Sequence, residues 1–148
     1  MRPARQLVLA ECDDRLYGVE LGGPGPDVVA TEELAGQVPV RFRPRDLVPS
    51  WAERLLVDCD SVGSTVVLLL DRRPPLLVSH DLGRTWTERG SGLPRGAAIA
   101  LGSNPDHVVV ASGGRLYVSL DGGVFWRSLD VELPEIADVA WGPGPLDG

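Results

Sequence analysis

The chain has 148 residues, of which 43% are hydrophobic, enough for one folded domain and too many for a disordered polar chain. Its formal net charge of −7 excludes a protein that follows nucleic-acid phosphates, because such a protein needs a surplus of basic side chains. The 18 glycines and 13 prolines predict many short segments separated by turns, and they exclude a helical bundle.

The N-terminal part of the chain predicts a strand hairpin followed by an insertion. Residues 8–17 parallel residues 109–117, with one residue inserted. Residues 22–37 then form the insertion, and residues 31–36 have the cap, the acidic first turn and the stopping glycine of a single helical turn. We expect the outer strand of this unit at residues 38–43.

Basic residues gather at the end of this expected outer strand. Arg41, Arg43 and Arg45 interrupt the acidic balance of the chain. Because side chains alternate across a strand, Arg41 and Arg43 would share one face. Two interpretations remain open. The arginines bind a carboxylate, a phosphate or an acidic partner, or their charge only protects an exposed sheet edge from pairing with other strands.

Two sets of four short strands follow, and they repeat with a period of 40 residues. We expect the strands of the first set at residues 55–59, 65–70, 75–79 and 84–88, and those of the second set at residues 97–101, 107–111, 115–119 and 124–128. When residues 79–105 are laid over residues 119–145, ten of the 27 positions are identical. Four-stranded repeats of this length are typical of β-propeller blades.

Each repeat contains a motif between its third and fourth strands, SHDLGRTW in the first and SLDGGVFW in the second. Its members are Ser79, Asp81, Gly83, Thr85 and Trp86 in the first copy, and Ser119, Asp121, Gly123 and Trp126 in the second. The motif resembles the Asp-box, or bacterial neuraminidase repeat, S-x-D-x-G-x-T-W, from which the second copy departs at Phe125.

This resemblance implies a β-propeller in which the motif forms a structural turn. A short aspartate side chain accepts hydrogen bonds from turn amides, glycine permits a positive φ, and tryptophan packs beneath the turn. The alternative interpretation is that Asp81 and Asp121 are catalytic carboxylates.

The strand count predicts an all-β chain of about three four-stranded antiparallel blades. The N-terminal blade, residues 5–45, lacks a first strand, and residues 136–141 can supply one; residues 52–90 and 95–130 form the other blades. Propellers typically have at least four blades. We therefore expect either a partial propeller or two copies of the chain that complete a six-bladed ring as a homodimer.

Two aspartates lie near the end of the first strand of the 52–90 blade. Asp58 and Asp60 alternate along this strand and would share one face, near the mouth of a propeller channel. In that position they could bind a cation or serve as acid and base, or they could be solvated loop residues.

The remaining reactive side chains match no catalytic or metal-binding pattern, so we expect no cofactor and no metal. Cys12 and Cys59 lack metal-ligand spacing and are expected as small buried side chains. The resemblance extends to sialidases, whose sites use a tyrosine nucleophile and an arginine triad. Tyr17 and Tyr117, however, share one Arg-Leu-Tyr context, which indicates a repeated structural position.

The sequence therefore predicts a cytoplasmic, non-catalytic interaction or scaffold module with a protein partner, and neither nucleic acid nor membrane as a ligand. The alternative is a glycan-binding or sialidase-like protein. A glycan binder presents exposed aromatic side chains for sugar stacking, and Trp51 and Trp141 are the tryptophans outside the two motifs.

Overall fold

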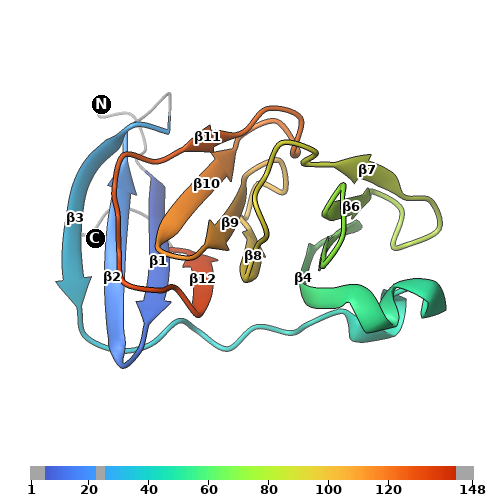
Figure 1. Cartoon of the computed structure of the whole chain (residues 1–148), viewed down its shortest axis with the longest axis horizontal. Coiled ribbons are helices and arrows are strands. Elements are labelled where there is room, and N and C mark those ends of the chain that lie inside the picture. Colours follow the sequence, from blue (N-terminus) through green and yellow to red (C-terminus); the bar gives the residue numbers. More distant parts are fainter. Residues whose placement is uncertain (1–5, 23–25, 143–148) are drawn as a thin grey trace.

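The computed structural model describes residues 6–22 and 26–142. In this part of the chain, twelve strands form three antiparallel sheets of four strands each (Figure 1). From its inner to its outer edge, sheet A contains β12 (Asp138–Trp141), β1 (Gln6–Cys12), β2 (Arg15–Leu21) and β3 (Val28–Leu34). In the same order, sheet B contains β4 (Leu56–Val62), β5 (Thr65–Leu70), β6 (Leu76–Ser79) and β7 (Thr87–Arg89). Sheet C contains β8 (Ala98–Leu101), β9 (Val108–Ser112), β10 (Arg115–Ser119) and β11 (Arg127–Ser128).

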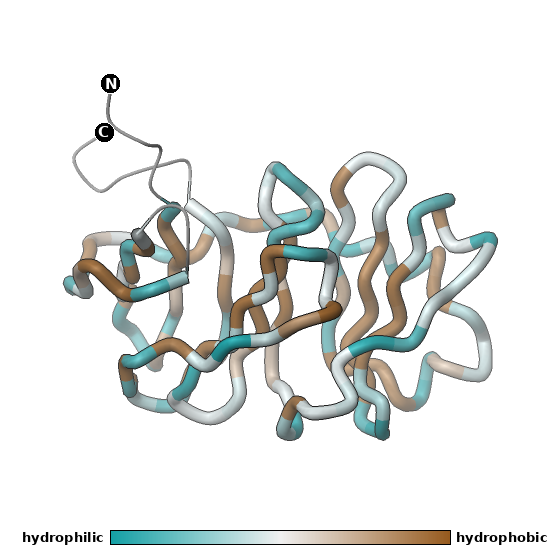
Figure 2. Tube along the Cα trace, turned by 90° about the horizontal axis from the view of Figure 1, so that it is seen from above, coloured by the Kyte–Doolittle hydropathy of each residue, from teal (hydrophilic) through white to brown (hydrophobic). Residues whose placement is uncertain are grey.

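Sheet C lies between the other two sheets. Its inner strand β8 contacts β12 of sheet A on one side and β4 of sheet B on the other (Figure 1). Sheet A joins the two ends of the chain, because β12 pairs with β1. Hydrophobic residues follow the strands, whereas hydrophilic residues gather in the turns at the rims (Figure 2). The three inner strands β4, β8 and β12 therefore meet at the centre of the molecule.

Apolar side chains fill the spaces between facing sheets. The core between sheets B and C includes Val67, Leu69, Leu76, Ile99 and Val110, and the core between sheets A and C includes Val8, Val19, Val109, Leu116 and Val139. Strand β5 is buried along its whole length. Because both faces of sheet B are covered, this strand is a continuous apolar run and does not alternate with polar residues.

The long connection between β3 and β4, residues 35–55, packs on sheets A and B; we call it the connector. It contains the 3-10 helices η1 (Arg45–Leu47) and η2 (Ser50–Leu55). Val48 and Ala52 of the connector are 8% and 0% exposed and pack on sheet B. Val38 is 7% exposed and packs on sheet A. The connector therefore contributes apolar side chains to the cores of both terminal sheets.

The expected strands of the two repeats are confirmed to within a few residues, but two expectations for the N-terminal unit are wrong. Residues 31–36 form no helical turn, because Val28–Leu34 is the strand β3, paired with β2. Its β-branched residues and the ladder with β2 outweigh the local helix-capping pattern. Since β3 holds the outer position of sheet A, residues 38–43 form no strand and belong to the connector.

Within residues 6–22 and 26–142, no helix has the length and apolar character needed to cross a lipid bilayer.

Replacing Leu69 by alanine tests the core between sheets B and C. Leu69 is 0% exposed, and the truncation leaves a cavity there. We expect a loss of about 2–5 kcal/mol in the free energy of unfolding, measured by urea denaturation. The matched control is Val29→Ala at a side chain that is 50% exposed, with an expected change within about 0.5 kcal/mol. Equal effects of the two substitutions would contradict this packing.

Candidate functional site

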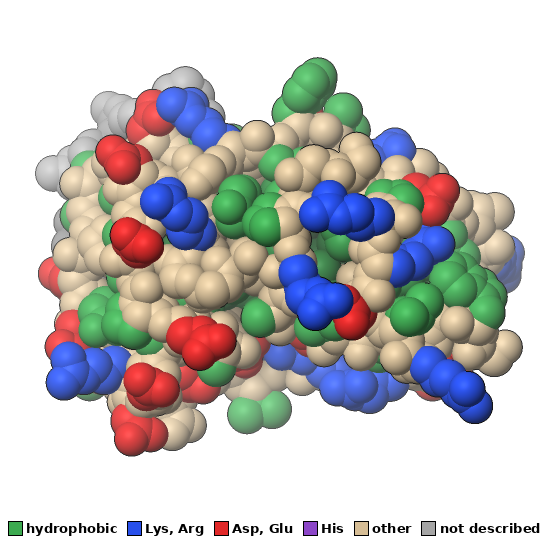
Figure 3. Space-filling view, viewed as in Figure 1, with side chains coloured by type: hydrophobic (Ala, Val, Ile, Leu, Met, Phe, Trp, Pro, Cys, Tyr) green, Lys and Arg blue, Asp and Glu red, His purple; other side chains and the backbone are tan. Residues whose placement is uncertain are grey.

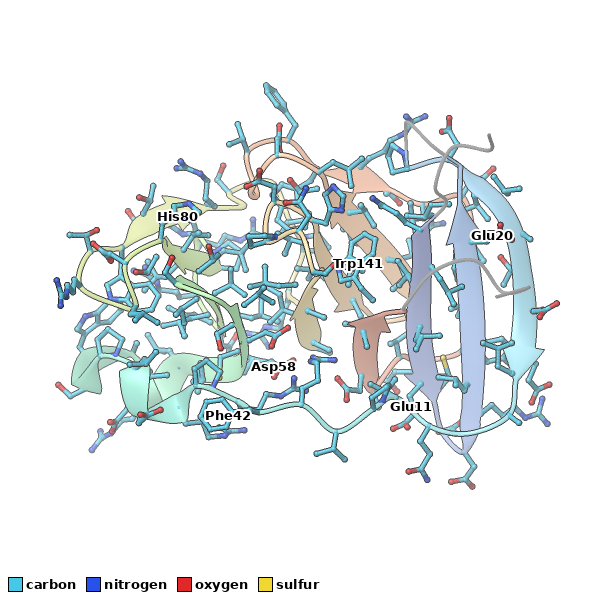
Figure 4. All side chains as sticks on the ribbon, turned by 180° about the vertical axis from the view of Figure 1, so that it is seen from behind. Glu11, Glu20, Phe42, Asp58, His80 and Trp141 are labelled. Carbon is cyan, nitrogen blue, oxygen red and sulfur yellow. The ribbon has the colours of Figure 1, made fainter. Side chains whose placement is uncertain are left out.

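The first half of the connector runs across the inner strands of the three sheets (Figure 1). Its side chains alternate between two sides. Arg41 and Arg43 turn inward, with side chains that are 18% and 22% exposed. Val40 and Phe42 turn outward and are 102% and 76% exposed. Figure 4 shows Phe42 on this segment, near Asp58 of β4. The alternation expected from the sequence is thus present, although the segment is not a strand.

The guanidinium group of Arg41 contacts all three inner strands. Its Nη1 donates a hydrogen bond to the carbonyl oxygen of Val139 in β12. Its Nη2 donates to the carbonyl oxygen of Ile99 in β8, at 3.2 Å. Its Nε lies 3.5 Å from Oδ2 of Asp60 in β4. One side chain therefore joins the three sheets at their centre.

Arg43 adds a second bridge between the outer two of these strands. Its Nε lies 3.3 Å from Oδ1 of Asp58 in β4, and its Nη2 donates to Oδ1 of Asp138 in β12, also at 3.3 Å. We call Arg41, Arg43, Asp58, Asp60 and Asp138 the arginine–aspartate cluster. Its two cationic and three anionic side chains sum to a formal charge of −1 when all are ionised.

The aspartates of β4 also serve as hydrogen-bond partners for the neighbouring strand. Oδ2 of Asp58 accepts the amide of Ile99 at 2.9 Å, and Oδ2 of Asp60 accepts the amide of Leu101 at 2.8 Å. β8 is the inner edge strand of sheet C, so these amides have no strand partner. Buried backbone donors need an acceptor, and carboxylates from the adjacent sheet provide it.

The cluster occupies equivalent positions in the three sheets. By their ladder registers, Cys59, Ile99 and Val139 stand at the same place in β4, β8 and β12. The residues just before them are Asp58, Ala98 and Asp138. Asp58 and Asp138 are thus separated by two periods of 40 residues. Asp138 is the cluster member that we did not single out from the sequence, and this spacing is the signal that could have identified it.

The surroundings of Asp58 favour a structural role for its carboxylate. Burial raises its pKa, and the amide of Ile99 and the guanidinium of Arg43 oppose this shift. Its Oδ1 also accepts the amide of Cys59 at 2.8 Å. Both oxygens therefore already have hydrogen-bond donors. In the described part of the chain, no group of three or more His, Cys, Asp or Glu side chains is placed to hold a metal ion.

The two sequence motifs form turns with the same hydrogen bonds. In the first turn, Ser79 Oγ donates to Asp81 Oδ1 at 2.7 Å, Gly83 N donates to Ser79 Oγ at 2.8 Å, and Thr85 N donates to Asp81 Oδ1 at 2.9 Å. The second turn repeats these contacts among Ser119, Asp121, Gly123 and Phe125, at 2.7, 2.9 and 3.0 Å. Both aspartates therefore organise the backbone of their own turns.

The hydrogen bonds stabilise the ionised form of these aspartates. Contacts from Thr85 and Ser79 lower the pKa of Asp81 from its usual 3.8 to about 2. The hydrogen bond from the backbone amide of Phe125 is the largest of the effects that lower the pKa of Asp121. Gly83 and Gly123 have φ angles of 88° and 92°, which a side chain would strain.

An aromatic groove lies between the outer strands of sheets B and C. It encloses about 810 Å³, and its lining includes Arg89, Tyr117, Phe125 and Trp126. Phe125 is 77% exposed and projects from the second turn. We did not identify this groove from the sequence. The usable signal is the departure from the motif, because Phe125 stands where the first copy has Thr85.

The other residues singled out from the sequence are not members of the cluster. Arg45 is exposed in η1. Trp51 is 56% exposed, and the guanidinium carbon of Arg72 lies 5.0 Å from its ring centroid. Trp141, labelled in Figure 4, donates from Nε1 to the carbonyl oxygen of Ala100 at 3.2 Å and thereby links sheets A and C.

Both cysteines are buried, as expected, and both are free thiols. Cys12 and Cys59 are 1% and 0% exposed. Burial raises the pKa of each thiol, which disfavours the reactive thiolate.

No known family model matches the chain, and no curated protein is similar to it. Among solved structures, the chain is similar to a GH74 enzyme of Niastella koreensis, with 19% sequence identity and a TM-score of 0.41. The similar region covers 84% of this chain and 18% of the enzyme chain, so this chain spans less than a fifth of that structure.

Replacing Arg41 by methionine tests the central role of its guanidinium. The substitution leaves Asp60, whose side chain is 4% exposed, without its cationic neighbour and removes the donors to Val139 and Ile99. We expect unfolding by urea to show a loss of about 3 kcal/mol. As a control, Arg127→Met removes an exposed pair with Asp27 and should cost less than about 1 kcal/mol. An Arg41 variant as stable as the control would refute this role.

Acid titration tests the two turns. Because the pKa of Asp81 is lowered in the folded chain, its contribution is complete above about pH 4 and is lost as the pH falls towards 2. The Asp81→Ala variant should therefore be less stable than the parent chain at pH 6, and the difference should shrink between pH 4 and 2. Urea unfolding at each pH measures this difference in stability, and Asp130→Ala at an exposed site is the control. A difference that is constant with pH would contradict the hydrogen-bonded turn.

Proposed function

We propose that the chain is a non-catalytic, propeller-type interaction module in which the Asp-box-like turns are structural. The observation that carries this proposal is the division of roles along the connector. Arg41 and Arg43 hold the three sheets together, while Val40 and Phe42 between and beside them are turned to solvent. Exposed apolar side chains on a fixed backbone are suited to contact another macromolecule.

The engagement of the charged residues supports a non-catalytic role. Asp58 and Asp60 accept backbone amides of β8, and Asp81 and Asp121 accept amides of their own turns. A catalytic acid or base needs an oxygen that can reach a substrate. These carboxylates instead face the backbone groups that they stabilise.

A protein partner fits this surface best. In one version of the proposal, the partner is a second copy of this chain, and the two copies complete a six-bladed ring. That arrangement would need η2 to leave the face of sheet B, where Ala52 is 0% exposed. We therefore favour a different protein as the partner.

A cytoplasmic location belongs to the same proposal and is supported by the two free thiols, since oxidising compartments favour disulfides.

Glycan binding is the second candidate, and the aromatic groove favours it. Tyr117, Phe125 and Trp126 line a groove of about 810 Å³ together with the polar side chains of Glu88 and Arg89. Aromatic faces with polar neighbours are a suitable surface for sugars, and this groove lies away from the connector.

Substitution of the two outward side chains tests the interaction module. We expect Val40→Ser combined with Phe42→Ser to lose, by tenfold or more, a partner that the parent chain recovers by affinity purification from its own host. The side chains are solvent-exposed, so thermal unfolding should be unchanged. The matched control is Leu82→Ser at a side chain that is 54% exposed in the turn between β6 and β7.

A glycan array separates the two candidate functions. Partner recovery that depends on Phe42, with no glycan bound, supports the module. Glycan binding that is lost in Phe125→Ala but kept in the Val40 and Phe42 double variant would overturn it in favour of the second candidate.

A further inference from the structure

The outer edge of sheet A differs from the outer edges of the other sheets. Outer strand β3 has 7 residues, whereas β7 and β11 have 3 and 2. Within the described residues β3 pairs with β2 alone, and it lies at the end of the molecule (Figure 1). An edge strand turns the N–H and C=O groups of alternate residues outward, where another strand can pair with them.

The exposed part of this edge is regular and acidic. Pairing with β2 is regular from Ala30 to Leu34, and a bulge at Val29 precedes it. Glu32 and Glu33 are both exposed. Because successive side chains alternate, Glu32 lies on the face of sheet A that carries Gly18, and Glu33 lies on the face that carries Tyr17. An added strand would therefore meet one carboxylate on each face.

The charge around the edge is mainly of the same sign, with Arg127 of sheet C 2.8 Å from Asp27 just before β3. Residues 6–34 contain seven acidic side chains and one arginine. That arginine, Arg15, lies 3.7 Å from Glu33, and both side chains are more than half exposed. In Figure 3, acidic side chains gather over the half of the molecule formed by sheet A, whereas most arginines lie over the other half. This negative electrostatic potential disfavours pairing of β3 with a second copy of itself. It favours pairing with a strand that carries basic side chains.

We propose that β3 is a strand-addition site for an extended basic segment of a partner protein. The backbone of residues 30–34 pairs with the segment, and two adjacent arginines or lysines of the segment face Glu32 and Glu33 on opposite sides of the sheet. This site is separate from the surface formed by Val40 and Phe42, so it stands or fails independently of that surface.

A synthetic peptide provides the direct test. The probe is a nonapeptide of threonine and valine with two adjacent central arginines, compared with the same peptide carrying two glutamates. We expect fluorescence anisotropy to show binding of the arginine peptide at least about tenfold tighter. Hydrogen exchange of the complex should show new protection of the amides in β3 and none in β7. A version N-methylated at alternate residues should not bind, because it cannot form the ladder.

Charge reversal on the protein completes the test. Glu32→Lys combined with Glu33→Lys should reverse the preference between the two peptides. The control, Asp46→Lys with Glu53→Lys, makes the same charge change at exposed positions on the connector and should keep the preference. Equal binding of the two peptides, full binding of the N-methylated peptide, protection outside β3, or dimers that pair through β3 would each overturn the proposal.

Discussion

The structure depends on how the backbone groups at the inner edges of three sheets are paired. Across residues 6–22 and 26–142, strands β4, β8 and β12 each leave one edge without a strand partner, and these edges meet at the centre of the molecule. Buried peptide groups without partners would cost more free energy than a small domain can supply. Side chains take the place of the missing strands: Asp58 and Asp60 accept amides of β8, and Arg41 donates to carbonyl groups of β8 and β12.

The connector adds apolar contacts to the two terminal sheets. Between β3 and β4 it places apolar residues on sheets A and B, and it brings Arg41 and Arg43 to the centre. The same segment leaves Phe42 outside, so the element that stabilises the fold also presents the apolar surface that we assign to a partner.

Much of the fold could be predicted because it depends on local sequence patterns, namely a repeat and short apolar runs. The period of 40 residues and the short apolar runs located the strands of sheets B and C, and the missing first strand of the N-terminal unit pointed to the C-terminal strand. The errors came from residues 31–43, where helix-capping residues lie within a strand whose partner is β2. The pairing of Arg41 with Asp60 joins positions 19 residues apart through a path that only the connector defines. Alternation showed that Arg41 and Arg43 share a side, but not what they face.

Native-state amide hydrogen exchange on the Arg41→Met variant tests this account most directly. If the guanidinium holds the inner edges together, amides of β4, β8 and β12, including those of Ile99 and Val139, should lose protection together, while amides of the peripheral strand β2 change less. Loss of protection confined to the connector, with β8 and β12 unchanged, would show that the three sheets are held by their apolar cores alone.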